Sequence, residues 1–157
     1  MKSRTNVVFM IFQDMAYRYG QNIGIAFQLV DDWLDFVSSA DMLGNNHPPT
    51  CSLIKLFFFS VGKPSAADLS LGLATAPVLF ASEQFPELNN LILRRFSQPG
   101  DVETAFRLVC QSEGLQQTQM LAVKYKDEAM NSIKSLKDSS DKDKLSYIAD
   151  KVISRMN

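Results

Sequence analysis

Residues Gly20–Asp35 read GQNIGIAFQLVDDWLD, and this stretch decides the fold class. It contains no proline, and its apolar residues recur at the three- and four-residue spacing of an amphipathic helix. At about 100° per residue, Asp31, Asp32 and Asp35 fall within roughly one quadrant of that helix. The stretch therefore predicts a helix with a carboxylate cluster on one face. Its other side carries the apolar side chains that would anchor it in a core: Ile23, Leu29, Val30 and Trp33.

An amide, an aromatic ring and two glycines share the acidic face of this predicted helix. Gln28 lies one turn before the acids, and Phe27, Gly20 and Gly24 lie within about 40° of Asp31. A solvated helix face has little use for an aromatic ring and two glycines. The pattern therefore indicates a cavity beside the acids that suits a long apolar ligand, although the glycines also fit close helix packing.

The carboxylate cluster predicts a magnesium site. Three carboxylates this close repel one another unless a counter-ion lies between them. Mg²⁺ takes one or two carboxylates and leaves its other positions to water and substrate phosphates. We therefore expect Mg²⁺ at Asp31, Asp32 and Asp35. A solvated acidic helix face is the alternative that the spacing leaves open.

The remaining sequence also predicts helices, and no segment alternates at period two, so the fold class is all-α. Ser65 and Asp68 can form a capping pair ahead of Leu69. Thr75 can cap a helix that has Pro77 in its first turn. Gly114 is expected to end a helix over 102–111, and the stretch Ser139-Ser140-Asp141 is expected to be a polar break that caps the last helix. Two longer helices are expected over 14–37 and 115–136.

Composition excludes several classes of protein. The chain has 157 residues, about one domain, with a formal net charge of −1 and 46% hydrophobic residues. It has no basic excess for binding nucleic acid by charge, and no apolar run of the roughly 20 residues that a transmembrane helix needs. Arg94 and Arg95 are expected at the surface, with a role in an interface as the alternative.

The sequence resembles a known enzyme family. YGQNIGIAFQLVDDWLDF (19–36) is similar to the second aspartate-rich region of the trans-polyprenyl diphosphate synthases. The similarity resumes at 63 with KPSAADLSLGLATAPVLFASEQFPELN and continues through RRFSQPGDVETAFRLVCQSEGLQQT. It resembles in particular the catalytic subunit of animal decaprenyl or solanesyl diphosphate synthases, which make the ubiquinone side chain. The resemblance implies an isoprenoid-synthase-type helical bundle.

The resemblance also implies an activity, substrates and residue roles. Such a transferase is a Mg²⁺-dependent prenyltransferase that elongates an allylic diphosphate with isopentenyl diphosphate. Asp31, Asp32 and Asp35 match the motif that holds Mg²⁺ on the allylic diphosphate, which implies catalytic and metal-binding roles for them. Lys63 matches a lysine that contacts that diphosphate, so it is expected to be both catalytic and substrate-binding.

Further implications concern the substrate pocket, the partners and the compartment. Phe27 and Gln28 match an FQ pair that lines the substrate site, and the ring face of Phe27 would favour a nearby allylic cation. The family assembles as homo- or hetero-oligomers of polyprenyl synthase subunits. Mitochondrial localisation follows from the family alone, because the sequence shows no transit peptide of its own.

The sequence departs from the family pattern upstream of the acids. The family has an earlier DDxxD on a facing helix, whereas Asp14 is the single acid here before Asp31. We therefore expect a bundle truncated to its C-terminal half. Two functions stay open: a prenyltransferase that is incomplete as this chain, or a non-catalytic partner or regulatory subunit of a heteromeric polyprenyl diphosphate synthase. A helical domain whose acids are only a solvated face is the third possibility.

The expected domain organisation has two departures from the family. Residues 1–13 are expected to be an N-terminal extension outside the family, and 14–157 a partial polyprenyl synthase domain. An insertion at 45–62, NNHPPTCSLIKLFFFSVG, separates two stretches that are adjacent in family members. Because LFFFS can be encoded by a pyrimidine tract, this insertion is interpreted as translated intron, with a lineage-specific loop as the alternative.

Overall fold

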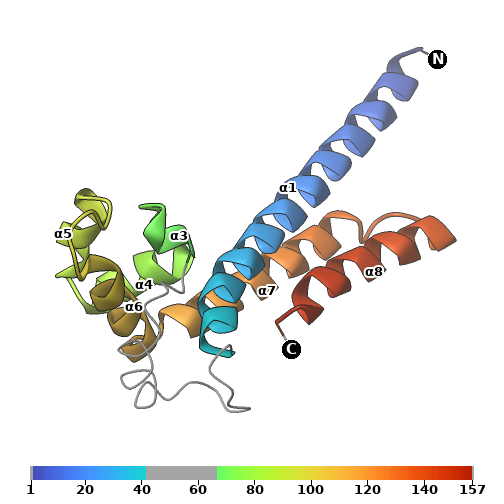
Figure 1. Cartoon of the computed structure of the whole chain (residues 1–157). Helices are drawn as coiled ribbons and strands as arrows, with labels where there is room; N and C mark the ends of the chain where they lie inside the picture. Colours follow the sequence, from blue (N-terminus) through green and yellow to red (C-terminus); the bar gives the residue numbers. More distant parts are fainter. Residues whose placement is uncertain (1, 42–66, 157) are drawn as a thin grey trace. The chain divides into compact units, whose positions relative to one another are not determined.

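The computed structural model describes residues 2–41 and 67–156, and all regular secondary structure in these ranges is α-helical (Figure 1). The all-α prediction is thereby confirmed. None of the described helices is both long and apolar enough to cross a membrane. The helices are α1 (Lys2–Asp41), α3 (Ala67–Ser70), α4 (Ala76–Gln84), α5 (Leu88–Leu93), α6 (Asp101–Gln111), α7 (Gly114–Ser132) and α8 (Ser140–Ser154).

The chain divides into two compact units, which are described separately. The first unit comprises Met1–Val30 and Met120–Asn157, and the second comprises Asp31–Gln119. Helices α1 and α7 contribute residues to both units. The three acids of the DDWLD motif belong to the second unit.

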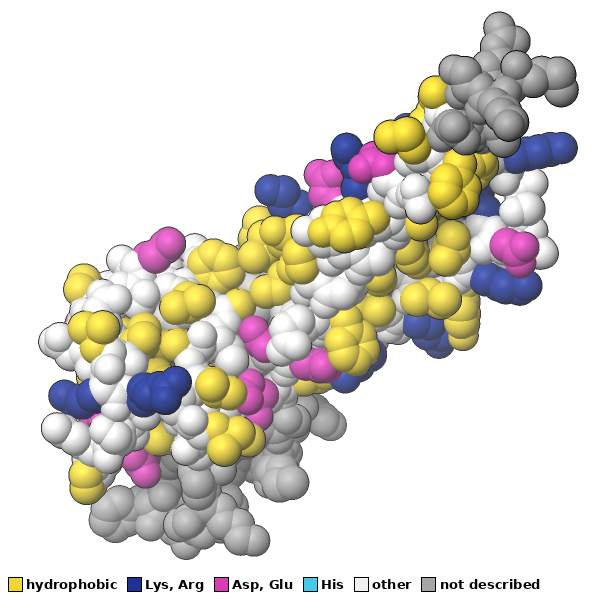
Figure 2. All heavy atoms as spheres, turned by 90° about the horizontal axis from the view of Figure 1, so that it is seen from above, with side chains coloured by type: hydrophobic (Ala, Val, Ile, Leu, Met, Phe, Trp, Pro, Cys, Tyr) yellow, Lys and Arg dark blue, Asp and Glu magenta, His cyan; other side chains and the backbone are white. Residues whose placement is uncertain are grey.

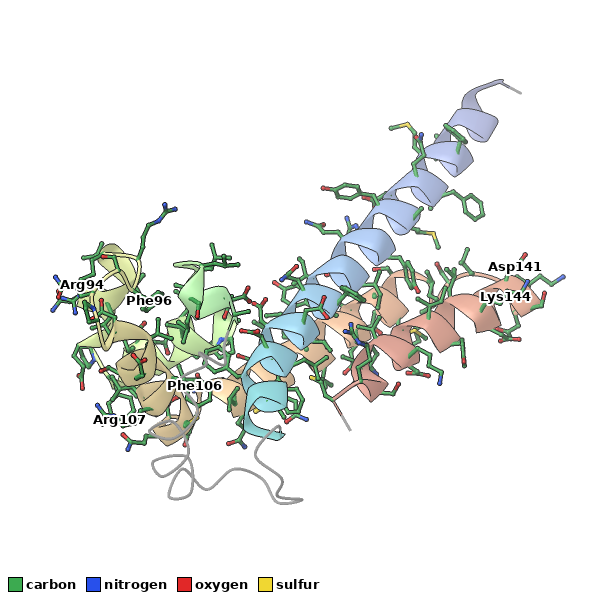
Figure 3. All side chains as sticks on the ribbon, in the orientation of Figure 1. Arg94, Phe96, Phe106, Arg107, Asp141 and Lys144 are labelled. Atoms are coloured by element: carbon green, nitrogen blue, oxygen red, sulfur yellow. The ribbon has the colours of Figure 1, made fainter. Side chains whose placement is uncertain are left out.

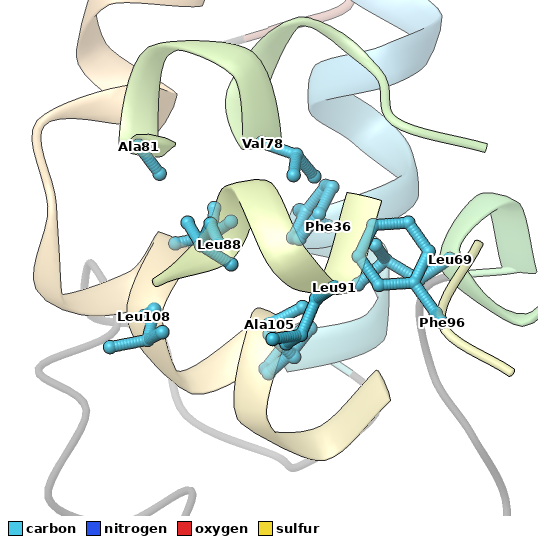
Figure 4. Close-up of a cluster of buried hydrophobic side chains, with 11 residues drawn as sticks. Phe36, Leu69, Val78, Ala81, Leu88, Leu91, Phe96, Ala105 and Leu108 are labelled. Atoms are coloured by element: carbon cyan, nitrogen blue, oxygen red, sulfur yellow. The ribbon is translucent and has the colours of Figure 1, made fainter. Parts of the chain in front are cut away.

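The second unit has the larger of the apolar cores described here (Figure 4). Phe36 of α1 is 1% exposed and stacks on Phe106 of α6, with ring centroids 5.6 Å apart and ring planes 9° apart. This contact fixes the end of α1 that carries the acids. The other buried members are Leu69, Val78, Ala81, Leu88, Leu91, Phe96, Ala105, Leu108 and Val109.

The first unit is held by a smaller cluster between α1, α7 and α8. Tyr19 of α1 packs with Ala129 and Ile133, and its hydroxyl donates a 2.7 Å hydrogen bond to the Leu145 carbonyl. Figure 1 shows α8 returning beside α7 after the turn between them. A cap was expected at 139–141, and Ser139 is the residue that caps α8, because its hydroxyl accepts the Lys142 N–H at 3.3 Å.

Several helix ends differ from the sequence-based expectation. Helix α1 begins at Lys2 instead of near residue 14, since residues 2–13 contain neither proline nor glycine to stop it. Helix α7 ends at Ser132, four residues before the expected end. Gly114 begins α7 instead of ending α6, and its N–H donates to the Ser112 hydroxyl at 2.9 Å.

An ion pair that sequence reasoning missed fastens the turn between α5 and α6. The Arg94 guanidinium donates to both carboxylate oxygens of Asp101, at 2.8 and 2.6 Å, and the Gln98 N–H donates to the same carboxylate at 3.1 Å. The Asp101 side chain is 6% exposed. The hydrogen bond from Arg94 lowers the pKa of Asp101 below its usual range. Arg94 and Arg95 are both exposed as expected, and Arg94 has a structural role in addition.

Removing this pair is expected to weaken the second unit in a pH-dependent way. We expect Arg94→Met to lower the thermal unfolding midpoint by several degrees at pH 7, because it leaves the Asp101 carboxylate without its guanidinium. Because the pKa of Asp101 is lowered in the folded state, its ionised carboxylate stabilises the folded protein at pH values above its unfolded-state pKa of about 3.9. This stabilisation is lost as the pH falls through the folded-state pKa of Asp101. The difference from wild type should therefore shrink in acid.

The matched control is Arg107→Met, which removes an exposed arginine from α6 (Figure 3). This variant is expected to unfold within experimental error of wild type at every pH. Equal midpoints for the Arg94 and Arg107 variants at pH 7, measured by circular dichroism, would contradict a stabilising role for the pair.

Candidate functional site

The three motif acids lie on the last turns of α1, at the start of the second unit. Asp32 is 7% exposed, whereas Asp31 and Asp35 are half-buried. Phe36 follows directly and is buried in the core, so it fixes the rotation of this part of the helix. A solvated acidic face would leave all three carboxylates exposed, and the burial of Asp32 argues against that alternative.

The Asp32 side chain, at the end of α1, caps the start of α4. Its Oδ2 accepts the backbone N–H of Ala76, the first residue of α4, at 3.2 Å. Thr75 occupies the N-cap position that the sequence predicted, but its hydroxyl makes no capping hydrogen bond and is buried without a partner. The prediction that the Thr75 side chain caps α4 is therefore wrong. The Asp32 carboxylate, from α1, accepts the backbone N–H at the start of α4 instead.

Asp35 makes the equivalent contact with α3. Its Oδ1 accepts the Ala67 N–H at 3.1 Å, and its Oδ2 accepts the Asp68 N–H at 3.3 Å. Backbone N–H groups at a helix start are unsatisfied within the helix and favour a negative partner. Two motif acids thus each serve the start of a separate helix.

Asp68 is a further carboxylate near the motif, and sequence reasoning treated it only as part of a local cap. Its pKa is raised, first by burial and then by the charges of Asp35 and Asp32. Nothing in the spacing of residues 35 and 68 announces this proximity, because the fold alone creates it. The expected capping partner, Ser65, lies outside the described residues.

The metal-binding roles of Asp31, Asp32 and Asp35 stay predictions. Across the described ranges, no group of three or more His, Cys, Asp or Glu side chains is arranged as a metal site. Lys63 and the insertion at 45–62 lie outside the described residues, so their expected roles are likewise untested.

The expected substrate-lining pair, Phe27 and Gln28, belongs to the first unit, and both residues are exposed. The Arg155 guanidinium lies 4.8 Å from the centroid of the Phe27 ring. An arginine therefore contacts the ring that was expected to favour an allylic cation. A methyl group added at Gly20 or Gly24 would meet no described atom within 4 Å beyond its own helix, so close packing does not explain these glycines here.

Comparisons with known proteins converge on one family. The model of the polyprenyl synthetase family matches residues 8–48. The human all trans-polyprenyl-diphosphate synthase PDSS1 is 47% identical over 145 residues, which are 92% of this chain and 31% of that protein. The probable mitochondrial hexaprenyl pyrophosphate synthase of Yarrowia lipolytica is 44% identical over 90% of this chain and 27% of its own length.

A solved structure agrees with these matches. The polyprenyl synthase of Caulobacter crescentus, complexed with calcium and isoprenyl diphosphate, superposes with a TM-score of 0.63 at 27% identity. The superposition covers 94% of this chain and 41% of that one. The chain therefore spans about a third of the length of the curated relatives it matches, and somewhat more of the solved structure.

Proposed function

Since the chain belongs to the polyprenyl synthetase family, we propose that it serves a trans-prenyltransferase that elongates an allylic diphosphate with isopentenyl diphosphate. The observation that carries the proposal is the placement of the DDWLD motif. Its acids lie on a helix end fixed by Phe36, and two of them reach the amino ends of the next helices. The similarity to prenyl diphosphate synthases extends over nearly the whole chain.

Magnesium fits the donor set at this motif. Asp31, Asp32 and Asp35 supply the hard oxygen ligands that Mg²⁺ prefers. The pKa of the neighbouring Asp68 is raised first by burial and then by the charges of Asp35 and Asp32. When bound, Mg²⁺ would neutralise the negative charge that develops on the diphosphate leaving group. We assign the three motif acids to hold the ion.

The substrate roles extend this proposal to residues outside the motif. Lys63 would contact the allylic diphosphate, and Phe27 and Gln28 would line the path of the prenyl chain. The product would serve as a polyprenyl side chain such as that of ubiquinone. The mitochondrial relative from Yarrowia supports a mitochondrial location for this protein as well.

A second candidate function is that of a partner or regulatory subunit in a homo- or hetero-oligomeric synthase. The first half of α1 exposes large apolar side chains (Figure 2), and such patches mark interaction surfaces. The residues involved are Val7, Phe9, Met10, Ile11, Phe12 and Tyr17, each more than half exposed.

One assay separates the two functions. The purified chain is incubated with farnesyl diphosphate, labelled isopentenyl diphosphate and Mg²⁺, with and without a full-length polyprenyl synthase subunit. Elongated product from the chain alone that disappears in Asp31→Ala supports the enzyme. A change in output that requires the full-length subunit supports the partner role.

The control variant is Asp127→Ala, which removes an exposed acid of the first unit that pairs with Lys126. It is expected to match wild type in both arms of the assay. If the chain yields no product alone and leaves the output of the full-length subunit unchanged, both candidate functions are overturned.

A further inference from the structure

We infer that Asp32 and Asp35 are positioning residues as well as acids of the proposed metal site. Their carboxylates fix the amino ends of α4 and α3, so the DDWLD motif orders the segments that surround it before any ion binds. The metal half of this statement rests on the proposed function, whereas the positioning half rests on the contacts alone.

The backbone of α4 shows why an outside acceptor is needed there. The first N–H groups of a helix have no partner within it and must be satisfied elsewhere. Pro77 has no N–H, and the N–H groups of Val78 and Leu79 donate to the Thr75 carbonyl at 3.0 and 3.1 Å. The Ala76 N–H is thus the one group of this turn that takes its acceptor from α1, and Asp32 supplies it at 3.2 Å.

Helix α3 depends on its cap even more, because it is a single turn. It covers four residues, and so short a helix is unstable without outside contacts. The Asp35 carboxylate accepts the N–H groups of both Ala67 and Asp68. The next residue, Leu69, is buried in the core and is 1% exposed. The carboxylate therefore holds the turn in the orientation that buries Leu69.

Substitution of Asp32 or Asp35 can distinguish the role of the negative charge from the role of the oxygen that accepts the N–H. Asparagine keeps one carbonyl oxygen that accepts an N–H but carries no charge for a metal ion. Alanine removes both the oxygen and the charge. Asp32→Asn should therefore preserve the start of α4 and weaken Mg²⁺ binding, whereas Asp32→Ala should lose both. At Asp35, which uses both oxygens, Asn should preserve part of the cap.

Amide hydrogen exchange of the whole chain, in EDTA so that no ion contributes, tests the positioning role. We expect the first-turn amides of α4 to exchange about fivefold faster in Asp32→Ala than in wild type, the factor given by loss of a typical cap. Asp32→Asn should remain near wild type. Asp35→Ala should speed exchange in α3, and Asp35→Asn should have an intermediate effect.

Ser139→Ala is the matched control, because it removes the N-cap of α8 in the other unit. It should speed exchange at the start of α8 and leave α3 and α4 unchanged. Wild-type protection of α6 in each variant shows that the second unit is still folded. If an alanine variant loses the protection of α6, the asparagine variant of the same residue is used instead. The inference is overturned if the first-turn amides exchange as fast in the asparagine variant as in the alanine variant.

Unchanged exchange of α3 and α4 in the two alanine variants would also overturn it. Binding of inorganic pyrophosphate in the presence of Mg²⁺, followed by calorimetry, reports separately on the proposed function. Faster exchange with no pyrophosphate binding in wild type would contradict the function and leave the positioning role standing. If the wild-type chain binds pyrophosphate but exchange is unchanged in Asp32→Ala and Asp35→Ala, the positioning role is contradicted and the proposed function stands.

Discussion

Phe36→Ala is expected to destabilise the second unit by about 3–5 kcal/mol, the usual effect of truncating a fully buried phenylalanine. The side chain is 1% exposed and stacks on Phe106. It also follows Asp35 directly, so the cavity would free the end of α1 that carries the motif. Chemical denaturation monitored by circular dichroism measures the loss.

Two controls bracket this prediction. Phe36→Leu keeps most of the apolar volume and should cost about 1.5 kcal/mol or less. Tyr17→Ala removes a side chain that is 68% exposed on the same helix, and should change stability by about 0.5 kcal/mol at most. An Ala variant at position 36 that is as stable as the one at position 17 would contradict the core described here.

Gly114→Ala is expected to destabilise the chain by about 1–3 kcal/mol, although alanine is the better helix former. An added Cβ would collide with the Pro77 carbonyl oxygen, lie 2.9 Å from the Ser112 hydroxyl and lie 3.3 Å from the Ala81 nitrogen. Two of these atoms belong to the backbone of α4 and cannot rotate away. The start of α7 would have to move away from α4.

Gly24→Ala provides the comparison with the opposite sign. A Cβ at this position in α1 meets nothing within 4 Å, so the substitution should stabilise the helix by up to about 1 kcal/mol. The two variants are compared by the same denaturation measurement. A Gly114→Ala protein at least as stable as wild type would show that α4 and α7 do not approach as described.

Local signals predicted the helical class and several helix starts. The cap of α8 lies within the expected stretch 139–141, at Ser139, and Thr75 stands at the N-cap position of α4. The Ser139 cap acts over three residues, which a sequence shows directly, whereas the Thr75 side chain makes no capping hydrogen bond. Gly114 carried the same kind of signal, a helix stop, but its cause is a close approach to α4 that involves residues more than 30 positions away.

The sequence predicted which acids make up the candidate site, but not the hydrogen bonds that they make with other helices. Helical spacing places Asp31, Asp32 and Asp35 on one face, and the structure keeps them on one helix end. The hydrogen bonds from Ala76 to Asp32 and from Ala67 to Asp35 span 44 and 32 residues. No periodicity or local motif encodes such pairs, since they form only when the core has brought the helices together.

The first unit gives a similar lesson at Phe27. The family resemblance implies that this ring lines the substrate site near an allylic cation. The structure adds a contact between this ring and Arg155, a residue near the other end of the sequence, and the expected substrate role of Phe27 stays a prediction. The approach of the chain's last helix to α1 had no signal in the spacing of either segment.

Binding of farnesyl diphosphate to the purified chain, measured by isothermal titration calorimetry with and without Mg²⁺, tests the central claim most directly. The claim is that the DDWLD helix end is a magnesium-dependent diphosphate site. It predicts binding that requires Mg²⁺ and that is lost in Asp31→Asn, with Asp127→Asn as the unaffected control. No binding, or binding that is equal in EDTA and in Asp31→Asn, would contradict it.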